Sequence, residues 1–340
     1  MDVIEEGRSR VILKENGVLN ATACDYPGSY TFDDTWSHEK FKKIFSVQIV
    51  KWNEREMEFD LIGIHAAIAN AFRRLLLSEV PSMAIEKVFV YNNTSLLQDE
   101  VLAHRLGLIP LKADPRLFEY RQPGDEDGTE QDTLEFQLKV KCTWNTNAPK
   151  DSTNPDDIYK DHKIYTRHMK WLPIGSQGDI YKAKDVGPVH DDILISKMRP
   201  GHELDLKLHV VKGIGKDHAK FSPVATAFYR LLPEIILTRD VEDEQAERLQ
   251  KCFSPGVIGI EESKHGKKKA KVLDARYDTC SRNVFRYEDL KDAVKMGRIK
   301  NHFIFTIESV GALPPDVLFI EAVKVLKLKC RIFLDELNRA

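Results

Sequence analysis

The stretch that decides the fold is AIANAFRRLLLSEVPSMAIEKV, residues 67–88. Apolar residues in this stretch and just before it recur every three or four positions, as they do on one face of a helix. We therefore predict an amphipathic helix over residues 64–78 that stops before Pro81. One face of this helix carries Ile64, Ile68, Ala71, Phe72, Leu75 and Leu76. The other side carries Asn70, Arg73 and Arg74, for which exposure to solvent is the ordinary interpretation.

Alternating apolar residues on both sides of this helix indicate β-strands. Before it, Phe45, Val47 and Ile49 predict a half-buried strand over residues 45–52, paired with residues 57–62 across a short turn. After it, the pattern predicts a β-rich middle region with strands near residues 85–91, 133–142, 164–171 and 203–211. Polar loops at residues 122–132 and 145–157 are expected to be exposed.

A second long amphipathic helix is predicted after Pro314-Pro315-Asp316, because proline is favoured in a first turn and an acid there complements the helix dipole. Its apolar stripe consists of Phe319, Val323, Leu326, Cys330, Phe333 and Leu337, widened by Leu318, Ala322, Val325 and Ile332. Such a stripe fits packing on its own domain or sharing with the helix of a partner. Before it we expect a short helix over residues 287–296 and a strand over residues 302–308.

Composition narrows the class of protein. The 340 residues predict two or three structural units, and 42% hydrophobic with 31% charged residues is typical of folded soluble proteins. With 51 basic and 53 acidic residues, the charge of the chain is nearly balanced. The chain as a whole therefore has no positive electrostatic potential that would attract nucleic acid. The cysteines form no Cys-x-x-Cys pair, which favours a reducing compartment. No secretory leader or membrane-spanning segment is expected.

Motifs of catalysis are not found in the sequence, and we predict no catalytic residue, metal site or cofactor. The run Gly213-Ile214-Gly215-Lys216 resembles part of a phosphate loop, but Asp217 stands where Ser or Thr would bind magnesium. We interpret it as a tight turn. The lysine-rich run 267–271 is predicted as the tip of a hairpin, with a localisation signal or phosphate-binding patch as alternatives.

Four segments in order carry a family resemblance. Residues 67–88 resemble the signature of the α-type assembly subunits of cellular RNA polymerases. Residues 92–111 (NNTSLLQDEVLAHRLGLIPL), residues 215–223 (GKDHAKFSP) and residues 305–326 match the same family. Together they span most of the chain from about residue 41 to residue 337. The residues of these motifs and the length of the chain most resemble those of the larger α-like subunits shared by eukaryotic RNA polymerases I and III.

The cysteines bear on the nearest alternative, the paralogous RNA polymerase II subunit. That relative is expected to carry a zinc-binding cysteine cluster in its middle domain, whereas Cys142 is the one cysteine here between Asp25 and Lys251. Archaeal relatives often hold an iron–sulfur cluster in a small ferredoxin-like subdomain. Cys252 and Cys280 fall in that region but cannot supply four thiolates. The resemblance therefore implies a subdomain without its metal ligands.

The resemblance implies an α+β fold with a discontinuous dimerisation domain, an antiparallel sheet with two long amphipathic helices. Residues 41–86 and 286–340 would form this domain. A mostly β insert domain would span residues 87–225, and a small ferredoxin-like subdomain residues 226–285. Residues 1–40, which show no sustained period, are expected to form an extended N-terminal arm.

The implied function is that of a non-catalytic assembly subunit in rRNA, 5S rRNA and tRNA transcription, located in the nucleus including the nucleolus. It would pair with the smaller α-like subunit and form a platform for the two largest subunits, meeting DNA and RNA only through the complex. The implied heterodimer interface comprises Ile68, Phe72, Leu75, Leu76, Phe319, Val323, Leu326 and Phe333, some of which could serve the internal core alone. The implied docking edge for the second-largest subunits comprises Asn70, Arg73 and Arg74. A stand-alone phosphate-binding enzyme is the alternative from a different class.

Overall fold

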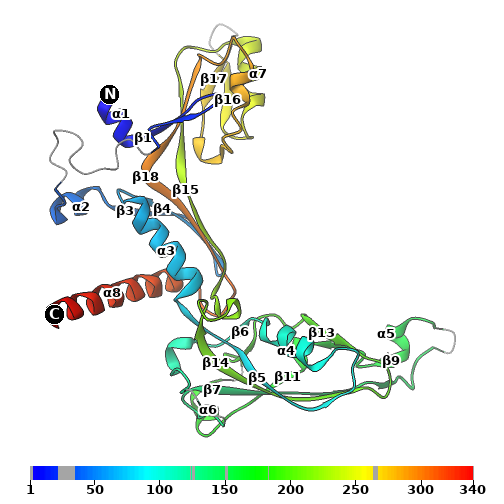
Figure 1. The fold of residues 1–340 in the computed structure, drawn as a ribbon. Helices are drawn as coiled ribbons and strands as arrows, with labels where there is room; N and C mark the ends of the chain where they lie inside the picture. The colour runs from blue at the N-terminus through cyan, green and yellow to red at the C-terminus, as the bar shows by residue number, and fades with distance from the viewer. Residues whose placement is uncertain are drawn as a thin grey trace. The chain divides into compact units, whose positions relative to one another are not determined.

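The computed structural model describes residues 3–21, 35–122, 124, 127–149, 152–182, 184–262 and 267–339 (Figure 1). The chain forms two compact units. Unit 1 comprises Met1–Val50, Glu58–Asn70 and Phe228–Thr306. Unit 2 comprises Lys51–Met57, Ala71–Ala227 and Ile307–Ala340.

A six-stranded sheet in the order β2-β1-β18-β4-β3, with β15 also paired to β18, supplies the framework of unit 1. Its strands are β1 Arg10–Leu13, β2 Val18–Leu19, β3 Ser46–Trp52, β4 Glu56–Ile62, β15 Val224–Leu237 and β18 Val294–Ser309. The core residues Phe59, Phe303 and Phe305 are fully buried. The rings of Phe59 and Phe305 stack with centroids 5.3 Å apart, so β4 and β18 share this core.

The N-terminal residues are more regular than predicted. Helix α1 spans Val3–Ser9, and β1 pairs antiparallel with β18 from Arg10 opposite Ile299 to Leu13 opposite Met296. An ion pair of 2.7 Å joins Arg10 to Glu234. The prediction of an extended arm was therefore wrong for residues 3–19, because strands this short leave no sustained period in the sequence. Residues 22–34 of the predicted arm lie outside the described residues.

Helix α2, His38–Ile44, follows, and the Ser37 hydroxyl caps it by accepting a hydrogen bond from the Lys40 amide. The predicted hairpin comes next. Strands β3 and β4 are neighbours in the sheet, and the Asn53 side chain accepts hydrogen bonds from the amides of Arg55 and Glu56 in the turn. The prediction that β3 is half-buried was wrong, because apolar side chains on both of its faces are exposed in the chain alone: Val47, Ile49, Val50 and Trp52.

The small subdomain within unit 1 has its own core. It contains α7 Asp243–Cys252, β16 Ile258–Glu262, β17 Lys268–Val272 and the 3₁₀ turns Ala275–Tyr277 and Asn283–Arg286. Val241, Ala246, Leu249, Val257 and Leu290 are fully buried in it. The predicted helix over residues 287–296 was wrong. Val294 and Met296 are buried on either side of exposed Lys295, which is the period of a strand, and β18 begins there.

The lysine-rich run is also placed differently from the prediction. Its residues from Lys268 onward lie in β17, antiparallel to β16, rather than at a hairpin tip. Its lysines form ion pairs with acids of the same subdomain: Lys267 with Glu242, Lys268 with Glu247, Lys269 with Asp240 and Lys271 with Glu261. The run is therefore largely neutralised within its own subdomain.

Unit 2 contains a four-stranded sheet in the order β11-β7-β14-β5. Its strands are β5 Pro81–Asn93, β7 Thr133–Lys141, β11 Met169–Leu172 and β14 Glu203–Ile214. Leu134, Phe136, Leu138, Leu204, Leu206 and Leu208 alternate along β7 and β14 and are fully buried beside α4, Asp99–Gly107. This confirms the predicted β-rich middle, although the strand predicted at residues 164–171 is divided into β10 Lys163–Tyr165 and β11 by the 3₁₀ turn Thr166–His168.

Shorter elements complete unit 2. They are β6 Leu111–Lys112, β8 Thr143–Trp144, α5 Pro155–Ile158, β9 Tyr159–Lys160, α6 Gln177–Ile180, β12 Gly187–Pro188, β13 Leu194–Lys197 and the 3₁₀ turns Pro115–Leu117 and Ala219–Phe221. The two predicted long helices are present as α3, Ala66–Ser78, and α8, Pro315–Arg339. Among the described residues, no helix combines the length and apolar character needed to cross a membrane.

The mixture of helices with antiparallel sheets confirms the α+β class. The two compact units do not coincide with the predicted segments, because the predicted dimerisation domain, residues 41–86 with 286–340, contributes to both. The strands β3, β4, β15 and β18 each include residues of both units. The division into dimerisation domain, insert and ferredoxin-like subdomain stays a prediction.

Candidate subunit interface

The start of α8 is fixed by a tight turn in unit 2. The Ser309 hydroxyl donates to the carbonyl oxygen of Leu313 at 2.5 Å and accepts from the Gly311 amide at 2.9 Å. Gly311 has a φ of +105°, and a Cβ there would lie 2.6 Å from Val189 Cγ1. A residue other than glycine would be strained in both respects. This turn fixes the point at which α8 begins, at Pro315.

The first half of α8 packs within unit 2. Leu318 and Ala322 are fully buried, and the Phe319 ring contacts the Phe72 ring of α3 with centroids 5.1 Å apart. The Lys329 ammonium pairs with the Glu79 carboxylate just beyond α3. The two predicted amphipathic helices therefore meet along one part of their apolar faces.

The second half of α8 has no such cover in the described part of the chain. Every described side chain from Lys327 to Arg339 is exposed. Phe333 is 73% exposed and Leu337 is 70% exposed, and Leu328, Ile332 and Leu334 are also more than half exposed. At 100° per residue, Leu328 and Ile332 lie on the side opposite Phe333 and Leu337. Apolar surface thus surrounds the end of the helix, which favours contact with another protein.

The residues predicted for the heterodimer interface fall into three groups by burial. Leu76 is fully buried and Leu75 is nearly so, which places both in the core of this chain. Phe72, Phe319 and Leu326 are half-buried, whereas Ile68, Val323 and Phe333 are exposed. Sequence analysis did not select Leu328 and Leu334, because they lie outside the stripe of steps of three and four. The only indication of them in the sequence was that this helix carries apolar residues on several sides. Such a helix needs more than one neighbour to cover it.

The polar side of α3 is partly engaged inside the chain. Asn70 and Arg73 are half-buried and both interact with other groups of this chain. Arg74 is exposed, and its backbone carbonyl accepts a hydrogen bond from the Ser78 hydroxyl. Of the three predicted docking residues, Arg74 presents the most surface to a partner.

The glycines of the run at residues 213–216 allow the backbone to pack closely against neighbouring groups. A Cβ on Gly213 would lie 2.7 Å from the Phe221 ring, and one on Gly215 would lie 2.2 Å from the Leu77 carbonyl oxygen. The Lys216 amide donates to the Ser78 carbonyl at 2.8 Å. This amide is therefore not available to a phosphate. The predicted turn is confirmed for Gly215 and Lys216, but it was wrong for Gly213 and Ile214, which end strand β14.

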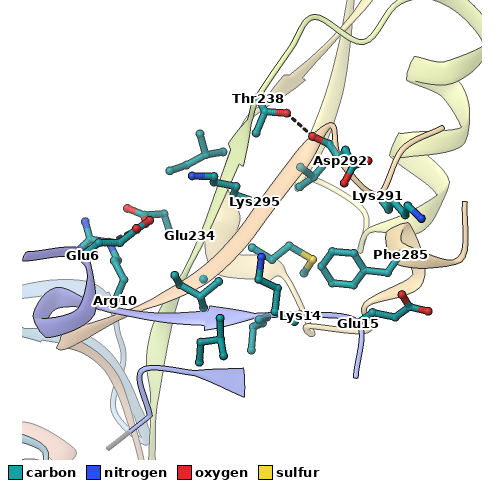
Figure 2. A pocket seen from close by; sticks show the side chains of 17 residues that line it. Glu6, Arg10, Lys14, Glu15, Glu234, Thr238, Phe285, Lys291, Asp292 and Lys295 are labelled. Atoms are coloured by element: carbon teal, nitrogen blue, oxygen red, sulfur yellow. Dashed lines mark hydrogen bonds and ion pairs between the residues drawn. The ribbon is translucent and has the colours of Figure 1, made fainter. Parts of the chain in front are cut away.

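Unit 1 has a pocket of about 500 Å³ whose charges balance (Figure 2). Its cationic side chains are Arg10, Lys14, Lys291 and Lys295, and its carboxylates are Glu6, Glu15, Glu234 and Asp292. Arg10 is paired with Glu234, and the Thr238 hydroxyl donates to the Asp292 backbone carbonyl. Such a pocket has little net field to concentrate a charged substrate.

Burial disfavours the thiolate form of two cysteines in the small subdomain, Cys252 and Cys280. Burial raises the pKa of Cys252. Burial also raises the pKa of Cys280, although the neighbouring Arg298 opposes the change. A raised pKa leaves little thiolate near neutral pH, so neither sulfur has the character of an activated nucleophile. Among residues that the structure describes, no three His, Cys, Asp or Glu side chains gather as metal ligands would.

Comparison with known proteins agrees with this arrangement. The family model described as the RNA polymerase Rpb3/Rpb11 dimerisation domain matches residues 58–330. DNA-directed RNA polymerases I and III subunit RPAC1 of Mus musculus is 61% identical over 336 residues, covering 98% of this chain and 97% of that protein. The protein of the same name from Saccharomyces cerevisiae is 50% identical over 321 residues, covering 93% of this chain and 95% of that protein.

A polymerase II relative is more distant. DNA-directed RNA polymerase II subunit rpb3 of Dictyostelium discoideum is 31% identical over 291 residues, covering 83% of this chain and 91% of that protein. The matched region of the family model includes α3 and the first half of α8, the helices that meet at Phe72 and Phe319. The chain therefore belongs to the Rpb3/Rpb11 dimerisation-domain family of RNA polymerase α-like subunits.

Proposed function

We propose that this chain is a non-catalytic assembly subunit of DNA-dependent RNA polymerases I and III. It pairs with the smaller α-like subunit, and the pair forms the platform on which the two largest subunits assemble. The proposal places it in the nucleus, including the nucleolus, in the synthesis of rRNA, 5S rRNA and tRNA. It reaches DNA and RNA only through the complex and uses no cofactor. The similarity to subunits named for polymerases I and III over nearly the whole chain supports this choice.

The uncovered second half of α8 is the observation that carries the proposal. Burying one Phe or Leu side chain contributes roughly 1.5 to 3 kcal/mol. The exposed residues Leu328, Ile332, Phe333, Leu334 and Leu337 together offer enough such surface to offset the entropy lost on association. The smaller α-like subunit is proposed to cover these residues together with Ile68 and Val323, while Leu75 and Leu76 hold α3 in place from inside.

The polar side of α3 is proposed to meet the second-largest subunits. Arginine guanidinium groups pair with carboxylates through two parallel hydrogen bonds, which gives both affinity and orientation. Exposed Arg74 would make such a contact directly, with Asn70 and Arg73 beside it on the same helix. The apolar and polar sides of α3 would then serve two different partners.

Affinity purification of the tagged chain from nuclear extract at moderate salt, followed by mass spectrometry, tests the proposal. Recovery of a small α-like protein with the large subunits of both polymerases I and III is the expected result. Recovery of polymerase II subunits alone would move the chain to the paralogous role. A chain that purifies as a free monomer would refute assembly function altogether.

A further inference from the structure

A pocket of about 700 Å³ in unit 2 lies beside the edge of the four-stranded sheet. Residues of the edge strand β11 line it together with residues of β6 and β12. Its lining carries four cationic side chains against one carboxylate, that of Asp191, an excess of three positive charges. The four cations, all exposed, are Lys112, Arg167, Lys170 and Lys184. Unlike the balanced pocket of unit 1, this pocket therefore attracts anions.

The four cations of the pocket lack the internal partners that other lysines of unit 2 have. Those other lysines form ion pairs, Lys139 with Asp205, Lys163 with Asp156 and Lys207 with Glu135. None of the four pocket cations forms such a pair with a carboxylate of the described residues. The Arg167 guanidinium lies 4.4 Å from the centre of the Tyr165 ring, a contact that orients the charge without neutralising it. Because like charges repel, a bound anion would stabilise this arrangement.

The buried part of the pocket lining is apolar. Phe136, Met169 and Val186 contribute to it, and all three are buried. Trp171 also lines the pocket, and its buried indole N–H has no acceptor among the described residues. A main-chain carbonyl of an occupant could supply that acceptor. The pocket thus combines apolar contact inside with positive charge on its exposed side chains.

Main-chain amides beside the pocket are engaged within the chain. The Arg167 amide donates to the Asp191 carbonyl at 3.1 Å, and the Val189 amide donates to the Pro110 carbonyl at 3.0 Å. Sites for a compact phosphate usually surround it with free main-chain amides. Here recognition is left to long, exposed side chains, which suit carboxylates spaced along a chain better than one compact anion.

A neighbouring pocket of about 600 Å³ extends this surface within unit 2. The two pockets share Lys112 and Val189 in their linings, and the neighbour adds the cation Arg55 and the apolar residues Leu313 and Pro314. Two adjoining pockets that repeat the combination of positive charge and apolar surface fit an extended segment.

We propose that these two pockets bind an extended segment of a partner protein that is rich in aspartate and glutamate, with apolar side chains between the acids. The acids pair with the exposed cations, and the apolar side chains contact the buried lining. This contact is additional to the heterodimer interface and the docking edge proposed above. Single-stranded nucleic acid suits the larger pocket less well, because its bases need exposed ring faces for stacking, whereas Phe136 is buried and Trp171 is half-buried. The exposed ring of Trp52 lies in the neighbouring pocket, so nucleic acid is the competitor to test.

Selection of a random peptide library, displayed on phage, against the full chain tests the preference for acids. Peptides that also bind a variant carrying Lys170→Glu and Lys184→Glu are removed, so the remaining peptides depend on the pocket. Both lysines are exposed, and the circular dichroism of this variant should match that of the wild type. We expect the remaining peptides to be rich in aspartate, glutamate and apolar residues. Peptides without an excess of acids, or no remaining peptides, would overturn the proposal.

Fluorescence anisotropy of one selected peptide with the full chain then measures affinity. Replacing the acids of the peptide by Asn and Gln should weaken binding about tenfold, and so should the paired lysine substitutions, because several ion pairs are lost. The matched control carries Lys160→Glu and Lys197→Glu, which change two exposed lysines of unit 2 outside both pockets. It should bind like the wild type. Equal losses in the two double variants would mean a general charge effect and no specific pocket.

Competing anions and a crosslinker identify the chemistry of the occupant. A water-soluble carbodiimide joins a lysine amine to a carboxylate as an amide, and it should link the peptide to Lys112, Lys170 or Lys184. Links to Lys160 alone would refute the assignment. Oligothymidylate and tripolyphosphate should displace the peptide poorly. If either binds more tightly than the peptide and loses affinity with Lys170→Glu and Lys184→Glu, the pocket is a phosphate site and the proposal is wrong.

Discussion

Arg276 donates from Nη2 to the Asp60 carboxylate at 2.5 Å, and little of either side chain reaches solvent. Arg276 also donates to Glu58, and the His302 ring contacts Asp60 at 2.8 Å. Hydrogen bonds to Asp60 and the nearby carboxylates raise the pKa of Arg276 despite its burial. A charge cluster thus connects the sheet of unit 1 to the segment beyond β17.

Loss of this guanidinium should be costly. Arg276→Met leaves the buried Asp60 charge without its main partner and should lower the free energy of unfolding by about 3 to 5 kcal/mol. Urea unfolding of the full chain measures the change. Lys271→Met is the matched control, because the Lys271–Glu261 pair is largely exposed and its loss should change stability little. Equal effects of the two substitutions would contradict the role given to burial.

Because the end of α8 is exposed, a substitution there should impair assembly with the partner without impairing folding. Phe333→Glu should leave the circular dichroism of the isolated chain unchanged, since the ring is 73% exposed. It should reduce recovery of the smaller α-like subunit at least tenfold, because a charge would be buried in an apolar contact. Arg331→Glu, on the same exposed turn, is the control for charge alone. Undiminished recovery with Phe333→Glu would remove this residue from the interface.

Phe72→Asp should act differently from Phe333→Glu. The Phe72 ring packs on Phe319 within the chain, so the charge would weaken both the helix pair and the heterodimer. We expect a lower unfolding midpoint as well as loss of the partner in co-purification. A variant that keeps the wild-type midpoint and still binds the partner would exclude Phe72 from both contacts.

A substitution in the glycine-rich run can distinguish a packing role from a phosphate-binding role. Gly215→Ala would place a Cβ against the Leu77 carbonyl and should destabilise the chain by about 1 to 3 kcal/mol. Gly187→Ala is the matched control, because no atom lies within 4 Å of a Cβ at that position. Calorimetry compares the two unfolding temperatures. A measurable affinity for nucleotide that Gly215→Ala abolishes without destabilisation would revive the phosphate-loop interpretation.

The cysteines should react with iodoacetamide in a defined order. Cys330 on the exposed end of α8 should react first in the free chain and be protected when the partner covers the helix. Cys280 is partly exposed, but its pKa is raised by burial, so its thiolate should appear only at a pH above the usual thiol range near 8.5. Peptide mapping over a pH series measures both. Faster labelling of Cys280 than of Cys330 in the free chain would contradict this environment.

Sequence periodicity located most of the regular elements but not their surroundings. The helices α3 and α8 and the hairpin of β3 and β4 follow from spacing and turn residues, which act locally. The exposure of Ile49 could not be predicted, because alternation shows that a residue is apolar and not what covers it. The short strands β1 and β2 were missed, since their pairing with β18 joins residues far apart in sequence.

The candidate site shows the same limit. Phe333 was selected from the stripe of α8, and the structure leaves it uncovered in the chain alone. Leu76 belongs to an equally regular stripe on α3 but is buried inside its own chain. Periodicity treats both residues alike, and only the tertiary structure distinguishes a core position from a position open to a partner.

The uncovered end of α8 also bears on how much of this protein a cell can hold. An unpaired copy displays apolar side chains around a full turn of helix, which is the kind of surface that chaperones and proteases recognise. Copies made in excess of their partner would be removed, whereas paired copies would hide the signal. The supply of the partner would then set the level of this subunit, and stoichiometry would be enforced by degradation of the surplus rather than by matched synthesis.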